Sequence, residues 1–396
     1  MSSRRAVSDA GLVPLVVLVT VGSVLPVFLL GANGPQVMAD LKFDAGGLGA
    51  VAGSYTIGLA VASLGLGRWL DRSSLPRAVL TATGLGIAGG VTAAATSSLP
   101  MLAIGLFASG VSSSTYQMSA GRILQNSVGG GGHGVAFGWF QSAKPVAVAV
   151  AGAFGMLATL GVGWRASFAG VTAVTAVLAA VLALWCVDHE PGTQKRSIEG
   201  GSRQGIVLLA ALMALGFGLT NISTTFLSDT VQVAGPAALG SGALLTVGGL
   251  LAAVGRVAAG RLTDVTGWDE LALVAPAFIA AGIGSILVGT LAWSAIVTGF
   301  LLIFALGWAF GGLLVAQGTR RYPGNSAAVV GVLLVGGAIG GSVSPPIFGA
   351  AATTWGYDVA WRGWGVAMLI AGLCAGVLAF RRQHSGQRRL KGGSDS

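Results

Sequence analysis

The sequence predicts an all-α membrane protein whose twelve transmembrane helices form two pseudo-symmetric halves of six. Three observations lead to this fold class. Of the 396 residues, 54% are hydrophobic and only 9% are charged, whereas charged residues approach a quarter of a soluble globular domain. Apolar runs of about 20 residues, the length that crosses the hydrocarbon core of a bilayer, recur along the chain. One long polar segment divides these runs into two sets.

Each apolar run is expected to be a helix, because backbone polar groups inside lipid must form hydrogen bonds within their own element. The first set of expected helices covers 11–31, 46–66, 77–98, 100–121, 134–160 and 165–187. The second set covers 205–228, 239–259, 271–292, 294–318, 326–351 and 362–380. We therefore expect an N-terminal half at 1–187, a cytoplasmic linker at 188–204, a C-terminal half at 205–382 and a cytoplasmic tail at 383–396.

The distribution of lysine and arginine predicts the orientation of these helices. With the N-terminus inside, cytoplasmic segments hold seventeen of the 22 basic residues, and external segments hold only Lys42, Arg165 and Arg362. Both termini are therefore expected in the cytoplasm, with the chain in a bacterial cytoplasmic membrane. The net charge of +9 follows from this topology, so it does not indicate binding to nucleic acid.

Two charged turns mark corresponding places in the two halves. The first, from Gly67, reads Gly-Arg-Trp-Leu-Asp-Arg-Ser-Ser-Leu-Pro-Arg, and a related turn, Gly-Arg-Leu-Thr-Asp-Val-Thr-Gly, begins 193 residues later at Gly260. A second repeated motif is Gly163-Trp164-Arg165, which corresponds to Ala360-Trp361-Arg362 in the second half. The two arginines are 197 residues apart. Nearly equal spacings are typical of parallel repeats related by an axis along the membrane normal.

The first turn resembles the loop between helices 2 and 3 of the major facilitator superfamily, whose pattern is roughly Gly-x-Leu-Ala-Asp-Arg-x-Gly-Arg. The helix count extends this resemblance over nearly the whole chain. It implies a transporter that alternates access to a substrate site near the midplane. We expect ion pairs in the turns to latch the cytoplasmic side, although basic residues placed there by topology alone are an alternative. The residues concerned are Arg68, Asp71, Arg72, Arg77, Arg261 and Asp264.

Two basic residues fall deep inside expected helices. Lys144 lies about ten residues into the run 134–160, or roughly 15 Å along a helix, and Arg256 lies about 12 Å deeper than Asp264. No acidic residue lies deep in an expected helix to neutralise them, so we expect the anion to be the ligand. Alternatively, Arg256 reaches the cytoplasmic headgroups or Asp264, and Lys144 bonds backbone carbonyls at a turn disrupted by Pro145.

The order Gly255-Arg256-x-x-x-Gly260-x-x-x-Asp264 is similar to helix 8 of the oxalate/formate antiporter and monocarboxylate transporter branches of this superfamily. The resemblance implies that Arg256 engages a substrate carboxylate, and that helices 5 and 8 bring Lys144 and Arg256 to one cavity. Those relatives also carry a lysine in helix 11, where this sequence has no cation and has Gly341 at the position 197 residues after Lys144. Our interpretation is that the second cation has moved to the symmetry-related helix.

Other polar and aromatic residues are candidates to line the same cavity, where polar groups would orient the ligand and rings would contact its apolar part. For each of them, packing between helices is an equally good interpretation. The candidates are Asn33, Tyr55, Tyr116, Gln117, Gln141, Asn221, Phe304 and Trp308, with Gln141 and Tyr116 preferred.

The predicted function is transport of a small organic anion of the carboxylate class, by a monomer in the lipid bilayer that uses no cofactor or metal. A proton or counter-anion remains open as the coupled species, but an acidic proton relay is disfavoured by the lack of carboxylates in the expected helices. An exporter of multiple drugs or of apolar and cationic compounds is the alternative. An enzyme is not expected, because His133, His189 and His384 fall in loops or the tail and no His-Glu-x-x-His sequence occurs.

Overall fold

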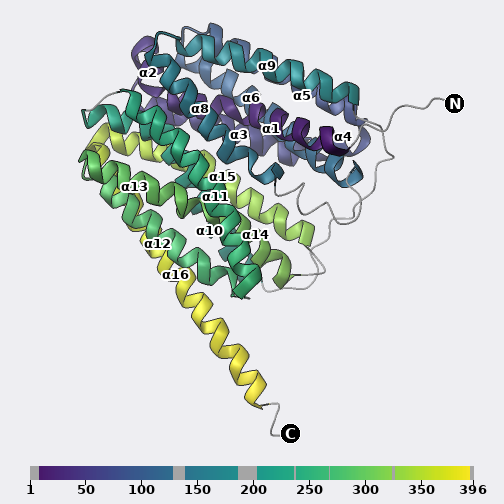
Figure 1. Cartoon of the computed structure of the whole chain (residues 1–396), viewed down its shortest axis with the longest axis vertical. Helices are drawn as coiled ribbons and strands as arrows, with labels where there is room; N and C mark the ends of the chain where they lie inside the picture. The colour runs from purple at the N-terminus through teal and green to yellow at the C-terminus, as the bar shows by residue number, and fades with distance from the viewer. Residues whose placement is uncertain are drawn as a thin grey trace, which may run out of the picture. The chain divides into compact units, whose positions relative to one another are not determined.

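The computed structural model describes residues 9–127, 139–185, 203–235, 238–266, 268–322 and 326–392. Within these ranges every regular element is a helix, as Figure 1 shows. Eleven described helical segments are long and apolar enough to cross a membrane. The 29-residue helix α6 (Leu99–Ser127) is a further long helix, and its serines, threonine and glutamine lower its hydropathy. The all-α fold class with twelve long helices is thereby confirmed.

Contacts between residues divide the chain into two compact units. The first unit comprises Met1–Lys195, Thr224–Gly249 and Pro345–Ala350. The second comprises Arg196–Ser223, Leu250–Ser344 and Ala351–Ser396. The expected linker at 188–204 lies almost wholly outside the described residues, so the predicted domain boundaries stay a prediction.

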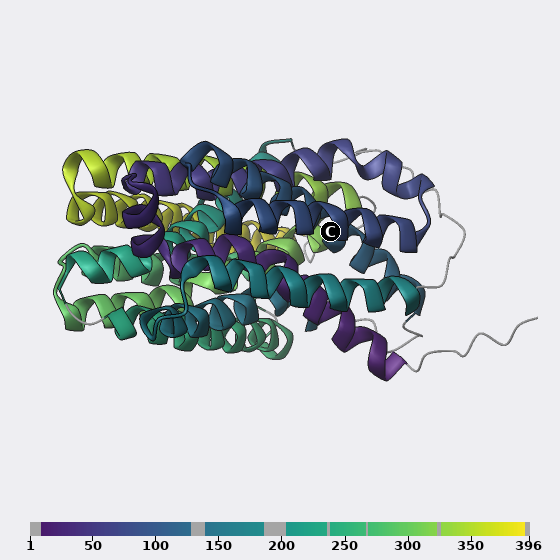
Figure 2. The same ribbon diagram turned by 90° about the horizontal axis from the view of Figure 1, so that it is seen from above.

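The first unit is built mainly from the helices of the expected N-terminal half, which run alongside one another in Figure 1 and Figure 2. They are α1 (Asp9–Ala32), α2 (Gly34–Leu41), α3 (Ala45–Gly65), α4 (Gly67–Arg72), α5 (Leu75–Ala95), α6, α8 (Ala143–Thr159) and α9 (Trp164–Trp185). Glycines let them approach closely: a Cβ added at Gly58 would lie 2.2 Å from the carbonyl oxygen of Phe107, and one at Gly110 would lie 2.0 Å from that of Tyr55. The pair α3 and α6 therefore packs backbone against backbone.

The second unit contains α12 (Glu270–Val288), α13 (Trp293–Ala305), the 3₁₀ turn η2 (Gly307–Ala309), α14 (Phe310–Arg321) and α16 (Tyr357–Gly392). Three further helices are shared between the units: α10 (Arg203–Val233), α11 (Ala238–Thr266) and α15 (Ser326–Trp355). In the second unit α12 packs along α16, where Gly282, Gly365 and Gly372 each lie against the partner helix.

Three expected helices differ from the observed ones by a break or by a turn at their start. The run 294–318 is not one helix, because it breaks after Ala305 into η2 and α14. The last helix begins at Tyr357, five residues before the expected start at 362, after Gly356 turns the chain with φ +91°. The run 134–160 is described only from Trp139, where a turn ending at Ser142 precedes α8. Hydropathy does not detect the break after Ala305, because the residues on both sides of it are apolar.

Candidate functional site

The break between α13 and α14 forms the environment of Arg256. The Arg256 Nε donates a hydrogen bond to the Trp308 carbonyl oxygen at 3.1 Å, and its guanidinium carbon lies 5.6 Å from the centroid of the Trp308 ring. The preceding residue allows this approach: a Cβ added at Gly255 would lie 2.0 Å from the carbonyl oxygen of Ala305, the last residue of α13. The adjacent Gly255 and Arg256 thus bring α11 against the broken helix.

Trp308 supplies a second donor at the same place. Its side chain is 1% exposed, and its indole Nε1 is buried without a hydrogen-bond partner among the described residues. Phe304 is fully buried and its ring centroid lies 5.3 Å from that of Trp308. A buried donor without an acceptor costs about 1–3 kcal/mol, so such a group in a native structure calls for an explanation.

Lys144 lies elsewhere in the chain and closer to a helix end than expected. It is the second residue of α8, five residues after the beginning of the candidate span Trp139–Ala158, and it is half-buried. Because Lys144 belongs to the first unit and Arg256 to the second, each is described by itself. Their convergence on one cavity stays a prediction.

An acidic residue falls inside a candidate span, contrary to the expectation from sequence. The span on α10 runs to Val233 and includes half-buried Asp229, whereas the expected helix ended at 228. The polar residues from Asn221 to Ser228 lower the hydropathy there, which made the expected helix too short. The inference of an anionic ligand therefore depends on the surroundings of Arg256 and not on a lack of acids.

The other expected lining residues are held in different ways. Asn33 lies between α1 and α2 and is 1% exposed. Its Nδ2 donates to the Leu29 carbonyl at 2.9 Å, and its Oδ1 is buried with no hydrogen-bond partner in the part of the chain that the structure describes. The Tyr55 hydroxyl donates to the Ser23 carbonyl at 3.3 Å, which joins α3 to α1. Asn221 is half-buried on α10, where its Nδ2 donates to the Phe217 carbonyl at 3.0 Å.

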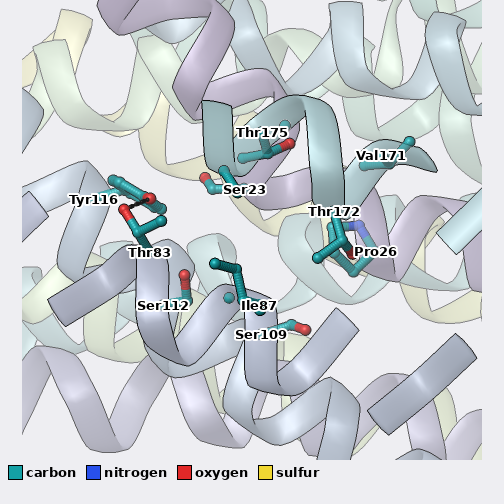
Figure 3. Close-up of a pocket in the computed structure, with 13 residues that line it drawn as sticks. Ser23, Pro26, Thr83, Ile87, Ser109, Ser112, Tyr116, Val171, Thr172 and Thr175 are labelled. Carbon is teal, nitrogen blue, oxygen red and sulfur yellow. Dashed lines mark hydrogen bonds between the residues drawn. The ribbon is translucent and has the colours of Figure 1, made fainter. Parts of the chain in front are cut away.

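Gln141 and Tyr116, the two lining residues preferred from the sequence, lie in different environments. Gln141 is exposed at the end of the short helical stretch 139–141 that precedes α8. Tyr116 is 3% exposed on α6, and its hydroxyl is hydrogen-bonded to Thr83 on α5 at 2.6 Å (Figure 3). Gln117, the next residue of α6, donates to the Ser113 hydroxyl at 3.1 Å. Tyr116 therefore faces a cavity inside the first unit, which is described below.

At the first charged turn, the contact that the structure shows involves a residue that sequence reasoning did not select. Arg122 on α6 donates through Nη1 to the carbonyl oxygens of Leu70 at 2.6 Å and Ser73 at 3.3 Å. A cation at the C-terminal end of a helix, here α4, binds carbonyls that have no intrahelical partner. Arg72 and Arg77 are exposed, and the side chains of Arg68 and Asp71 lie outside the described residues.

At the second turn, Asp264 pairs with a residue that was not among those selected from the sequence. Asp264 pairs with Arg320 of α14 at 4.0 Å, and Arg320 also contacts the buried Glu270 of α12 at 2.9 Å, whereas Arg261 is exposed. Arg320 stands in the last turn of α14 and Glu270 in the first turn of α12, positions that suit a cation and an anion respectively. These charges at helix ends were the sequence pattern from which Arg320 and Glu270 could have been selected.

Comparisons with known proteins agree with this architecture. The family model described as Major Facilitator Superfamily matches residues 16–345. Among solved structures, a bacterial homologue of the human lysosomal transporter Spinster, inward-facing and unoccupied, is 16% identical with a TM-score of 0.73, covering 96% of this chain and 97% of the other.

Two further structures are similar to this chain. The nucleoside transporter NupG, as a mutant, is 15% identical with a TM-score of 0.70 and coverage of 91% and 99%. A mutant of the peptide transporter POT is 13% identical with a TM-score of 0.77 and coverage of 94% of both chains. No curated protein sequence matches this chain. At these identities the structures show the fold alone. With the family model matching most of its length, the chain belongs to the major facilitator superfamily and is an integral membrane transporter.

Proposed function

We propose that this transporter carries a small organic anion, in the first instance a carboxylate, by alternating access. The observation that supports the proposal most is the pair of donors at the broken helix, Arg256 and the indole N–H of Trp308. Discontinuous helices are where transporters of several folds place their substrate sites, because backbone and side-chain polar groups are accessible there.

The geometry around Arg256 suits a planar anion. The hydrogen bond from Nε to the Trp308 carbonyl holds the plane of the guanidinium, and the two Nη groups carry the four other N–H donors of an arginine side chain. Such a fork binds a carboxylate through two parallel hydrogen bonds. An anionic oxygen beside the Trp308 indole would also accept from the N–H that has no acceptor among the described residues.

In our proposal the aromatic side chains around Trp308 contact the apolar part of the organic anion. Phe300, Phe304 and Trp308 follow one another along α13 and η2, with ring centroids 6.3 Å and 5.3 Å apart. A wall of this kind contacts apolar ligand atoms and excludes water, which strengthens the electrostatic interaction with Arg256. In our proposal Lys144 adds a second positive charge on the substrate path.

The experiment is uptake by purified protein in proteoliposomes, with radiolabelled carboxylates of increasing size and with an organic cation for comparison. We expect uptake of a carboxylate, an about 10- to 100-fold loss in Arg256→Ala, and a smaller loss in Trp308→Phe, which keeps the ring but removes the donor. Lys144→Ala should also lose uptake. The control is Arg362→Ala, which removes an exposed arginine of α16 in the same unit and should transport normally.

Unchanged anion uptake in both Arg256→Ala and Lys144→Ala would contradict the proposal. Uptake of the organic cation with no uptake of any carboxylate would favour the alternative, an exporter of apolar or cationic compounds. Exchange against a trapped anion, compared with uptake driven by a pH gradient, separates a counter-anion from a proton as the coupled species.

A further inference from the structure

A partly open cavity of about 30 Å³ lies within the first unit and is lined by residues of α1, α5, α6 and α9 (Figure 3). Seven hydroxyl-bearing residues line it together with glycines and apolar side chains, most of its surface is apolar, and no charged side chain of the described residues borders it. A space of about 10–15 Å³ holds one water molecule, so this cavity has room for about two waters or for one small ion. Figure 3 shows Ser23, Ser112 and the bonded pair of Thr83 and Tyr116 around one common space.

Six hydroxyls on the cavity wall have their single proton already engaged. Five of them donate to backbone carbonyls, and the sixth, on Tyr116, is bonded to Thr83. The five donations are from Ser23 to Thr20 at 2.8 Å, Thr83 to Val79 at 2.8 Å, Ser109 to Gly105 at 2.9 Å, Ser112 to Ala82 at 2.6 Å and Thr172 to Phe168 at 2.7 Å. These oxygens can therefore offer only lone pairs to an occupant.

The direction of the bond between Tyr116 and Thr83 follows from this assignment. Because the Thr83 proton goes to the Val79 carbonyl, Tyr116 must be the donor in the 2.6 Å contact between the two hydroxyls. The Tyr116 oxygen then also presents lone pairs. The cavity wall thus has several acceptors drawn from four helices, all directed by bonds that the fold itself makes.

Glycines bring these oxygens close to the neighbouring helices. A Cβ added at Gly86 would lie 2.8 Å from the Ser112 Oγ, and one at Gly22 would lie 2.2 Å from the Thr175 Oγ1. Larger residues at these positions would displace the hydroxyls or fill the cavity. The small residues of α1 and α5 thereby keep the space open.

From this arrangement we infer that the cavity binds a small monovalent cation of about the size of Na⁺. A cluster of neutral oxygen dipoles can replace the hydration shell of an alkali-metal ion without a carboxylate, as rings of carbonyl oxygens do in channel filters. An anion would meet lone pairs at the six hydroxyls described above, with Thr175 as the one further lining hydroxyl, and the cavity is too small for an organic amine. The inference depends on the first unit alone and not on the identity of the transported substrate.

The alternative interpretation is that these hydroxyls serve helix packing and that water fills the space. Serine and threonine in helices often donate to the carbonyl three or four residues earlier, which four of the six do. Ser112 and Tyr116 differ, because both bond across from α6 to α5. These two hydroxyls are therefore the ones whose removal tests the inference.

The test is thermal unfolding of the purified full-length protein, without organic anions, in NaCl and in choline chloride at equal ionic strength. Choline is too large for the cavity, so we expect Na⁺ to raise the melting temperature by about 2–4 °C relative to choline. Binding of radioactive sodium to the wild-type protein should saturate, with an about tenfold weaker dissociation constant in Tyr116→Phe and in Ser112→Ala.

Two further variants complete the design. Ser54→Ala removes a hydroxyl of α3 that bonds the Val51 and Ala103 carbonyls away from this cavity, and it should bind sodium normally. Gly86→Ala narrows the cavity and should weaken binding even where both hydroxyls remain. Equal melting temperatures in the two salts together with no saturable sodium binding to the wild type would mean that the cavity holds water only, and would overturn the inference. Sodium binding unaffected by all three cavity variants would overturn it equally.

Discussion

Single glycines determine which backbones of the first unit can touch. Gly31 on α1 is buried, and a Cβ added to it would lie 2.0 Å from the carbonyl oxygen of Thr224 on α10. Gly84 on α5 is exposed, and a Cβ there would meet no atom within 4 Å. The same residue type thus has opposite roles at two helical positions, since only the first is required by a close approach of backbones.

This contrast predicts opposite effects of the same substitution. Gly31→Ala should destabilise the protein by about 1–3 kcal/mol, because α1 and α10 must move apart to admit the methyl group. Gly84→Ala should stabilise it by about 0.4–1 kcal/mol, because alanine restricts the unfolded chain and fits the helix. Thermal unfolding in detergent measures both, and a lower melting temperature for Gly84→Ala than for Gly31→Ala would contradict the packing described.

At the scale of elements, a polar cluster joins the short helix α2 to the beginning of α9. Asp40 of α2 accepts hydrogen bonds from the Arg165 guanidinium and from the Trp164 indole, the latter at 3.0 Å. Arg165 also donates to the Thr96 carbonyl at 2.8 Å, where α5 ends, and lies 4.3 Å from the centroid of the Trp164 ring. One arginine therefore connects three elements at the end of the unit that the charge distribution assigns to the outside.

The cluster predicts a dependence of stability on pH. The hydrogen bonds from Arg165 and Trp164 hold the pKa of Asp40 below its ordinary value, so their contribution is present above the unfolded-state pKa and is lost as pH falls through the folded-state pKa. We expect the melting temperature of the wild type to fall below about pH 4, and Asp40→Asn to fall less steeply.

The control for this prediction is the Arg165→Gln background. Once the arginine is absent, the Asp40→Asn change should have a much smaller effect on the pH dependence, because the main cause of the lowered pKa has gone. Identical pH profiles for the wild type and Asp40→Asn would show that this carboxylate does not link α2 to α9 in solution.

At the scale of the whole molecule, the family membership and the charge distribution together predict the orientation in the membrane. Basic residues are concentrated in alternate connecting segments, so the segment around Arg77 should be cytoplasmic and that around Val162 external. Both side chains are exposed at the ends of helices of the first unit.

Cysteine labelling of intact cells measures this orientation. With Cys186 and Cys374 replaced by serine, Val162→Cys should react with a membrane-impermeant maleimide, whereas Arg77→Cys should react only after the cells are permeabilised. The reverse pattern would show that the chain inserts with the opposite topology. Labelling of both variants in permeabilised cells controls for the accessibility of each thiol.

The sequence by itself determined the fold class and most of the long helices, and it singled out Arg256 as a candidate. These depend on patterns that are local in the chain: apolar runs of bilayer length, and a cation within such a run. The glycines and charges of the two repeated turns predicted the superfamily, and the match to the family model confirmed it. Composition was therefore enough to predict the fold class, because the bilayer imposes the same length and the same apolar character on every transmembrane helix.

Only the tertiary structure decided which groups meet. It showed that the helix over 294–318 breaks at Trp308 beside Arg256, that Arg320 and not Arg261 pairs with Asp264, and that Tyr116 faces a hydroxyl-lined cavity in the first unit. Each of these contacts joins residues more than thirty positions apart, and many apolar helices can be rotated about their axes without changing their hydropathy. Side-chain packing selects one rotation, and for that reason the partners of each polar group had to be seen in three dimensions.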